Sequence, residues 1–127
     1  MRLLVDTHVL LWAASSIDKL SPDQRRYLED PLHTPVVSAA SLWEITIKVN
    51  AGKLKLPVSL EQFFADLEFH SFEILPVKPS HLLNLASLPF WHRDPFDRLM
   101  IAQARAEAIP VLSQDGVFAK YDIQLIG

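Results

Sequence analysis

The sequence contains no cysteine. Disulfide bonds, zinc–thiolate sites and thiol nucleophiles are therefore excluded, and any bound metal must have oxygen or imidazole ligands. Glycine is also scarce, with three residues in a chain of 127. Neither the Gly-x-Gly-x-x-Gly pattern nor a P-loop occurs, so a nucleotide cofactor is not expected.

Long apolar runs are missing as well. The run that begins the chain, from Met1 to Val5, is too short for a signal peptide, and no segment approaches the ~18 apolar residues of a membrane span. We therefore expect a cytoplasmic protein without a membrane segment. The net charge of −3 does not favour binding of a nucleic acid, because polyanions are bound through Lys and Arg.

The composition that is present fits one folded domain. Half of the 127 residues are hydrophobic, which provides enough material for a core, and the length is near the common domain size. Charged residues make up only 21%, which suggests that another chain covers part of the surface. Because the sequence has no repeat, low-complexity tract or internal linker, residues 1–127 are expected to form a single domain.

Short apolar runs alternate with helical patterns along the chain. Strands are predicted at residues 2–6, 36–38, 72–77, 110–113 and 123–126. Helices are predicted at residues 7–14, 21–30, 41–51, 60–70, 80–88 and 97–108, several of them marked by a capping residue or a terminal glycine. This alternation predicts an α/β fold in which helices cover both faces of a central parallel sheet of four or five strands.

Four carboxylates are predicted to lie at one edge of that sheet. Asp6 closes the first strand, Asp115 follows the strand at 110–113, and Glu44 and Asp97 fall in the first turns of their helices. Functional groups of open α/β sheets gather at the carboxyl ends of the strands. Side by side, these carboxylates would repel one another unless cations lay among them, and such oxygen clusters select Mg²⁺ or Mn²⁺.

Each carboxylate also has a purely structural explanation. Asp6 would cap the helix that follows it. The segment from Ser41 to Glu44 fits a capping box, and Asp94 fits the cap of the next acidic helix. Asp115 and Gly116 form a common turn pair. Taken singly, each carboxylate is explained at least as well by these structural roles as by a site.

The helical periodicity favours a site. Asp97 lies on a helix face that should be buried, and a charge there needs a partner or a metal. Glu44 lies on a similar face, although Lys48 is available as an i,i+4 partner. The other residues on the Asp97 face are all apolar, namely Met100, Ile101, Ala104 and Ala108.

Five segments give the chain a resemblance to a known family. The fourth of them, which reads His-Arg-Asp-Pro-Phe-Asp-Arg-Leu-Met-Ile-Ala-Gln-Ala, is the most specific. On these segments the chain resembles the PIN-domain superfamily and, within it, the VapC-type toxins of toxin–antitoxin pairs. They lie in the family's order and cover nearly the whole chain, at Leu4–His8, Val37–Ile45, Gly52–Pro57, His92–Ala104 and Pro110–Asp115.

The resemblance implies a PIN-like three-layer α/β/α fold and specific roles for the acids. Asp6, Glu44 and Asp97 match the three core acidic residues of the family, and Asp115 matches a weaker fourth. These four are expected to be catalytic and to hold Mg²⁺, with Mn²⁺ as the other candidate ion. Asp94 is a second acid of the same motif and a second-tier metal ligand, and the division of work between it and Asp97 stays open.

The activity implied by the resemblance is metal-dependent hydrolysis of RNA. The metal would polarise the phosphate and lower the pKa of a bound water, which Ser113 would orient, and in-line attack would leave a 5′-phosphate and a 3′-hydroxyl. The implied partners are an RNA substrate, a cognate antitoxin and a second copy of the chain in a homodimer. The alternative is a catalytically inactive PIN-like interaction module, which the intact carboxylates disfavour.

Two other enzyme or signalling classes fit less well. A HAD-type phosphatase needs a second Asp two residues after Asp6, where this chain has His8. A receiver domain needs an acidic pair at the first strand, and that pair is absent. His8 itself is expected to pack or cap, and His92 to shape the loop before the acidic motif.

The remaining candidates are basic and aromatic. Arg93 and Arg98 flank the acids and are either phosphate contacts or charges on the helix surface. Trp12 and Trp43 are expected to pack in the core or an interface, whereas Trp91 lies in a predicted loop and is the candidate for stacking on a base.

Three predicted helices, at 21–30, 41–51 and 60–70, flank the sheet with many apolar side chains. About half of these side chains are expected to pack on one another. The remainder should form an exposed groove for a short antitoxin segment that becomes ordered on binding. The set is Leu11, Trp12, Tyr27, Leu28, Ile47, Val49, Phe63, Phe64 and Leu67.

Overall fold

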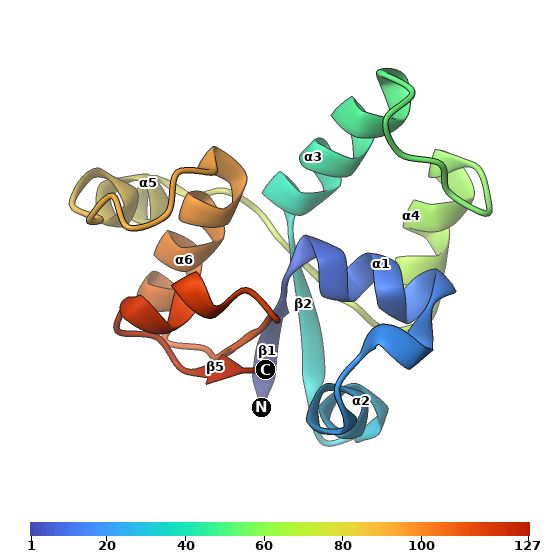
Figure 1. The fold of residues 1–127 in the computed structure, drawn as a ribbon, viewed down its shortest axis with the longest axis horizontal. Coiled ribbons are helices and arrows are strands. Elements are labelled where there is room, and N and C mark those ends of the chain that lie inside the picture. The colour runs from blue at the N-terminus through green and yellow to red at the C-terminus, as the bar shows by residue number, and fades with distance from the viewer.

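The computed structural model describes residues 1–127 and shows a five-stranded sheet with helices on both sides (Figure 1). All neighbouring strands pair in parallel, in the order β3-β2-β1-β4-β5. The predicted three-layer α/β/α fold with a central parallel sheet is therefore confirmed. The strands are β1 (Arg2–Val5), β2 (Thr34–Ser38), β3 (Glu73–Leu75), β4 (Val111–Leu112) and β5 (Leu125–Ile126).

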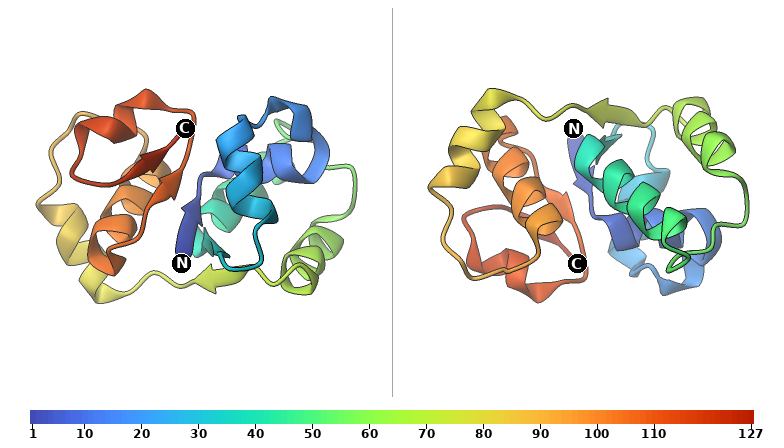
Figure 2. Two further views of the ribbon diagram at one scale, coloured as in Figure 1. Left: turned by 90° about the horizontal axis from the view of Figure 1, so that it is seen from below. Right: turned by 90° about the horizontal axis from the view of Figure 1, so that it is seen from above.

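Helices connect the strands on both sides of the sheet. Figure 2 shows α5 and α6 grouped on one side and α1 to α4 on the other. None of the helices combines the length and the apolar character that a membrane span requires. The α-helices are α1 (Thr7–Ser15), α2 (Pro22–Glu29), α3 (Ala39–Asn50), α4 (Leu60–Phe69), α5 (Pro79–Ala86) and α6 (Pro95–Glu107), with 3₁₀ helices η1 (Ile17–Lys19) and η2 (Gly116–Lys120).

Each face of the sheet buries its own core. Leu3 and Val5 of β1 pack with side chains from α1, α3 and α4. Leu4, between them, points to the opposite face and packs with side chains from α6 and η2. Successive strand residues face opposite sides, so a continuous apolar run indicates a strand that is covered on both faces.

Helix α3 begins two residues earlier than the sequence predicts. Ser38, the last residue of β2, is the N-cap, and its hydroxyl accepts the backbone N–H of Ala40 at 3.0 Å. Ser41 is fully buried inside the helix, where its hydroxyl contacts Thr7 at 3.0 Å. The predicted capping box from Ser41 to Glu44 is wrong, because the strand runs directly into the helix.

Of the nine apolar side chains that were divided between mutual packing and a groove, more than the expected half pack on the core. Phe63 and Leu67 are buried, and among the nine only Ile47 is exposed. The other six lie against the core cluster. A groove of about 680 Å³ is nevertheless present between α1, α2 and α4, and its lining includes Leu10, Ala13, Ile17, Leu28, Phe63 and Leu67.

A polar network holds the amino-terminal edge of the sheet together. Arg2 of β1 contacts Glu73 of β3 and Glu107 of α6. His81 of α5 is fully buried and its Nε2 lies 3.0 Å from Glu107. The backbone N–H of Lys78 donates to Nδ1 of His81, so the ring proton is on Nε2 and is donated to Glu107. The His81 hydrogen bond is the main cause of the lowered pKa of Glu107, and Arg2 adds to it.

We expect Glu107→Gln to destabilise the protein at neutral pH by about 2 kcal/mol, the scale of a hydrogen bond to a charged group. The folded-state pKa of Glu107 lies below its usual 4.5, so its contribution is fully present above that pH. It is lost as the pH falls through the folded-state pKa, and the variant should lack this loss. Urea unfolding from neutral to acidic pH measures both effects. Glu68→Gln, on an exposed residue of α4, is the control, and equal behaviour of the two variants would contradict the assignment.

Candidate active site

The first strand delivers Asp6 to the carboxyl edge of the sheet. Asp6 occupies the N-cap position of α1, but its side chain makes no capping hydrogen bond. Its Oδ2 instead accepts the hydroxyl of Ser113 at 2.7 Å. Burial raises the pKa of Asp6, and the Ser113 hydrogen bond opposes this rise. The explanation of Asp6 as a simple helix cap is therefore wrong.

Ser113 joins two of the acidic residues. It follows β4, is fully buried, and donates its hydroxyl proton to Asp6. Its oxygen accepts the backbone N–H of Asp115 at 3.0 Å. Since its one proton is used by Asp6, Ser113 positions this carboxylate, and the water-orienting role that the resemblance implies stays a prediction.

Helix α3 places Glu44 beside the same edge. Glu44 is 5% exposed, its Oε1 accepts the hydroxyl of Thr7 at 3.0 Å, and its Oε2 contacts Nζ of Lys48 at 2.9 Å. The pKa of Lys48 is raised, mainly through the hydrogen bond with Glu44 and further by the charges of Asp94 and Asp97. The ammonium group therefore lies within the electrostatic reach of Glu44, Asp94 and Asp97.

Helix α6 contributes two acids with different surroundings. Asp94 is its N-cap, and Oδ1 accepts backbone N–H groups of the first turn, including that of Asp97 at 3.1 Å. The predicted capping role of Asp94 is confirmed. The pKa of Asp97 is raised to about 7, first by burial and then by the negative charges of Asp6, Asp94 and Glu44.

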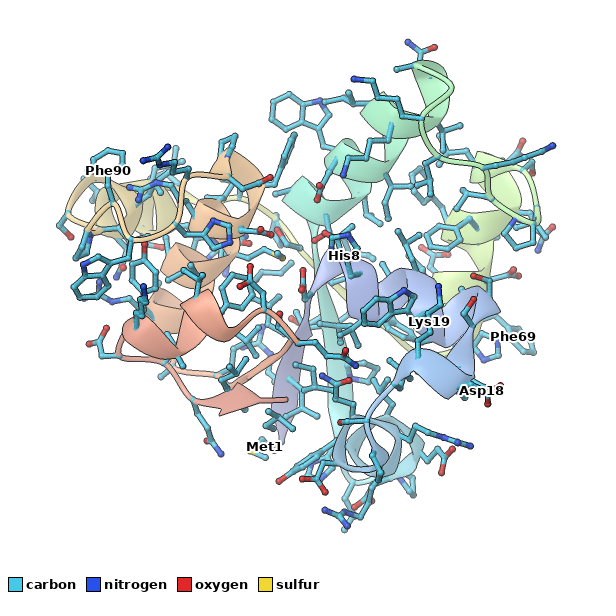
Figure 3. The ribbon with its side chains drawn as sticks, in the orientation of Figure 1. Met1, His8, Asp18, Lys19, Phe69 and Phe90 are labelled. Carbon is cyan, nitrogen blue, oxygen red and sulfur yellow. The ribbon has the colours of Figure 1, made fainter.

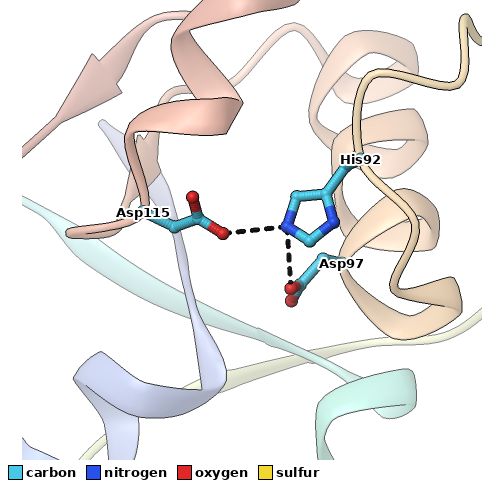
Figure 4. Close-up of side chains that lie close together, drawn as sticks. All are labelled: His92, Asp97 and Asp115. Atoms are coloured by element: carbon cyan, nitrogen blue, oxygen red, sulfur yellow. Dashed lines mark hydrogen bonds and ion pairs between the residues drawn. The ribbon is translucent and has the colours of Figure 1, made fainter.

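Asp115 and His92 lie beside the acids described above. Oδ1 of Asp115 caps η2 by accepting the N–H of Val117, and Oδ2 lies 2.8 Å from Nε2 of His92. The same nitrogen lies 3.1 Å from Oδ2 of Asp97 (Figure 4). Burial raises the pKa of Asp115, but the hydrogen bonds from Val117 and His92 outweigh it and leave the pKa lowered. His92 was predicted only to shape its loop, so its position between two acids was missed.

The five predicted acids thus meet at the carboxyl edge of the sheet. One potential ligand atom each from His92, Asp97 and Asp115 lies within 4.8 Å of the others. Asp6 adjoins them through Ser113, while Glu44 and Asp94 act on Asp97 through their charges. Opposite ligands of Mg²⁺ lie about 4.2 Å apart, so the spacing and the oxygen-rich donor set fit Mg²⁺ or Mn²⁺.

The two arginines of the motif differ sharply. Arg98 is 7% exposed, so neither a phosphate contact nor a surface charge describes it. Its guanidinium group lies 3.9 Å from the ring centre of Phe90. Phe90 itself is exposed at the periphery of the molecule (Figure 3). Arg93 is exposed and forms no ion pair. The groups that accept hydrogen bonds from Arg98 are the carbonyls of Leu88, Pro89 and His92.

The three tryptophans differ in how far they are exposed to solvent. Trp12 packs against the core, as predicted, and Trp91 is 54% exposed. Trp43 is 62% exposed, so it does not pack in the core, and packing in an interface stays a prediction for it. Its ring meets Phe96 edge-on with the centres 5.3 Å apart. Trp43 and Phe96 directly precede Glu44 and Asp97 in sequence, which places an aromatic pair, of which Trp43 is exposed and Phe96 half-buried, beside the acids.

We expect Asp97→Asn to stabilise the metal-free protein at about pH 8. The folded-state pKa of about 7 exceeds the usual 3.8, so ionisation opposes folding increasingly as the pH rises from 3.8 to 7. The gain should be about 2 kcal/mol, less than the full shift would give because solvent partly screens the side chain. Denaturant unfolding with a chelator present measures it. Near pH 4 the variant and the wild type should differ little, and a variant less stable at pH 8 would contradict the raised pKa.

The comparisons with known proteins agree with this architecture. No curated protein sequence matches the chain. Among solved structures, VapBC2 of Rickettsia felis bound to promoter DNA matches with a TM-score of 0.73 and 18% identity, over 99% of this chain and 98% of that one. VapBC-1 of nontypeable Haemophilus influenzae matches with 0.70 and 16%, over 99% and 97%. At these identities the matches show a shared fold. The sequence pattern of the PIN domain matches residues 3–124, and the chain therefore belongs to the PIN domain family.

Proposed function

We propose that the protein is a VapC-type toxin, a Mg²⁺-dependent endoribonuclease that acts in the cytoplasm, with residues 1–127 as one PIN domain. Its products are RNA ends with a 5′-phosphate and a 3′-hydroxyl. One observation carries the proposal, namely that acids from the end of β1, from α3, from the start of α6 and from the segment after β4 converge. Burial and the charges of Asp6, Asp94 and Glu44 there raise the pKa of Asp97 to about 7. The fold shared with chains of VapBC complexes supports it.

In this proposal Asp6, Glu44, Asp97 and Asp115 hold the ion. Asp94, whose Oδ1 caps α6, is a second-tier ligand. When bound, a divalent cation supplies Lewis acidity at the phosphate and lowers the pKa of a water for in-line attack. Mn²⁺ is the alternative ion, since the donors are mainly carboxylate oxygens.

The protein's own side chains orient the acids. Ser113 fixes Asp6 through a short hydrogen bond, and Thr7 fixes one oxygen of Glu44. Lys48 neutralises the other oxygen of Glu44 with an ammonium group that is 43% exposed. An RNA phosphate that approaches the site would meet this cation, which offsets part of the local negative charge.

The aromatic pair of Trp43 and Phe96 supports single-stranded RNA as the substrate. Every base has a face that stacks on an aromatic side chain, so such a pair binds unpaired bases with little sequence preference. Trp43 has the exposed area that stacking needs, and it lies beside an acid of the site. Arg93, exposed and without an ion-pair partner, offers a further phosphate contact on the same segment as Asp94.

Partner binding is the second part of the proposal. The groove between α1, α2 and α4 has an apolar lining and the volume to hold side chains of an antitoxin segment. On α5, Leu82 and Leu83 are 50% and 74% exposed, and Ile47 on α3 is 43% exposed. These side chains supply apolar area for a homodimer. A catalytically inactive PIN-like module would use the same surfaces, so the nuclease test below separates the two functions.

We expect the purified protein to cleave single-stranded RNA when Mg²⁺ or Mn²⁺ is added and to stop when a chelator is added. Loss of a metal ligand removes several kcal/mol of the stabilisation that the metal gives to the transition state of the cleavage, so Asp6→Asn and Asp97→Asn should each lower kcat at least about a hundredfold. The same ions should raise the melting temperature of the wild type and raise it less in these variants.

Asp18→Asn, on an exposed residue of η1, is the matched control and should cleave at the wild-type rate. Mapping of RNA ends after expression in a bacterium, with and without Asp97→Asn, identifies the cleaved RNA. Equal thermal shifts in all variants, together with no cleavage by the wild type, would exclude the nuclease and leave the interaction module.

Expression of the toxin alone should inhibit growth, and co-expression of the neighbouring small gene should relieve the inhibition. Ile17→Asp places a charge in the apolar groove and should abolish the relief while leaving the toxicity intact. Leu32→Asp, on an 80% exposed residue outside the groove, is the control and should behave as wild type. Relief that persists in Ile17→Asp would show that the antitoxin binds elsewhere.

A further inference from the structure

His92 lies between two acids that come from different parts of the fold. Its Nε2 is 2.8 Å from Oδ2 of Asp115, which follows β4, and 3.1 Å from Oδ2 of Asp97, on α6 (Figure 4). The side chain is 13% exposed. Because its nitrogen lies within 4.8 Å of both oxygens, distance alone would make His92 a candidate ligand of a metal bound there.

The hydrogen bond on the other side of the ring argues against that role. The backbone N–H of Asp94 donates to Nδ1 of His92 at 3.2 Å. A nitrogen that accepts a hydrogen bond carries a lone pair, so the ring proton resides on Nε2 and points at the carboxylates. For Nε2 to bind a metal, the proton would have to move to Nδ1, where it would face the N–H of Asp94.

The surroundings prevent the ring from turning away from this arrangement. The backbone N–H of His92 donates to the hydroxyl of Tyr121 at 2.8 Å, and its carbonyl accepts from Arg98 at 3.3 Å. The imidazole ring packs on Phe118 with the ring centres 5.7 Å apart. The N–H of Asp94 is fixed as well, because Asp94 is the N-cap of α6.

We propose that His92 is a positioning residue of the metal site, whose Nε2–H gathers Asp115 and Asp97 while its nitrogen stays off the metal. This rests on the proposed function, and it names the residue that joins the fourth acid to the site. It also leaves the bound ion with oxygen ligands only. Oxygen ligands suit Mg²⁺ and Mn²⁺, whereas imidazole suits Zn²⁺ and Ni²⁺, so the arrangement favours the former ions.

The first test is metal affinity, measured by calorimetric titration of the purified protein with Mg²⁺. Loss of a residue that orients metal ligands weakens binding by about 10–100-fold, and we expect this loss in His92→Ala. His92→Gln should recover part of the affinity, because its amide N–H can reach the carboxylates. His70→Ala, on an exposed residue that follows α4, is the matched control and should bind Mg²⁺ as the wild type does.

The second test distinguishes positioning from ligation. Nitrogen NMR of the metal-free wild type should show the His92 proton on Nε2. Pulsed EPR of the Mn²⁺-loaded wild type should show no directly bonded imidazole nitrogen. A proton on Nδ1, a bonded nitrogen, or unchanged Mg²⁺ affinity in His92→Ala would each overturn the assignment of His92.

These outcomes differ from failure of the proposed function. If the wild type bound neither Mg²⁺ nor Mn²⁺, the nuclease proposal would fall, and the metal-site role of His92 with it. If the wild type bound Mg²⁺ and cleaved RNA while His92→Ala bound Mg²⁺ equally well, only the role of His92 would be lost.

Discussion

The repulsion between clustered carboxylates is the constraint on which the rest of this structure depends. A parallel sheet brings its strand ends to one edge, and here five acids lie at that edge. Among them Asp97 has the pKa that is raised most, to about 7. Such a cluster is stable only when donors hold the acids in place. Ser113 donates to Asp6, Thr7 and Lys48 to Glu44, and His92 to Asp115. At Asp97 burial and the charges of Asp6, Asp94 and Glu44 dominate, and its pKa rises to about 7.

The same histidine arrangement occurs at both edges of the sheet. In His81 and in His92, a backbone N–H donates to Nδ1 and the Nε2–H faces carboxylate oxygens. In both cases the backbone donor lies near the start of a helix, so the start of that helix fixes which nitrogen carries the proton. At the amino-terminal edge the hydrogen bonds of His81 join α5 to α6 and have no role in the site. At the carboxyl edge the hydrogen bonds of His92 join α6 to the segment after β4, and there they organise the candidate metal ligands.

Local patterns in the sequence predicted the sheet and the placement of the acids well. Short apolar runs bounded by prolines and capping residues specify buried parallel strands, and the strand ends then fix where Asp6 and Asp115 lie. The predictions that failed concern contacts between residues that are far apart in the sequence. No pattern near His92 reveals that Asp115, 23 positions later, accepts its proton. Arg98 was misjudged because the carbonyls that bind it belong to a loop whose path cannot be derived from periodicity. Core packing was wrong for Trp43 because the way α3 packs on the sheet decides which of its faces is buried, and the buried face is that of Ala40, Ser41, Glu44 and Ile45.

The distribution of positive charge bears on how a polyanion could reach this site. With Arg98 committed to carbonyl groups, Lys48 and Arg93 are the basic residues nearest to the acids, and Lys48 is already paired with Glu44. In the metal-free protein the edge of the sheet therefore presents more negative than positive charge to an approaching phosphate. A bound divalent cation would reverse that balance and would also compete with Lys48 for Glu44. On the proposed function, the ion is thus needed for substrate binding as well as for chemistry, because without it the site repels the molecule on which it acts.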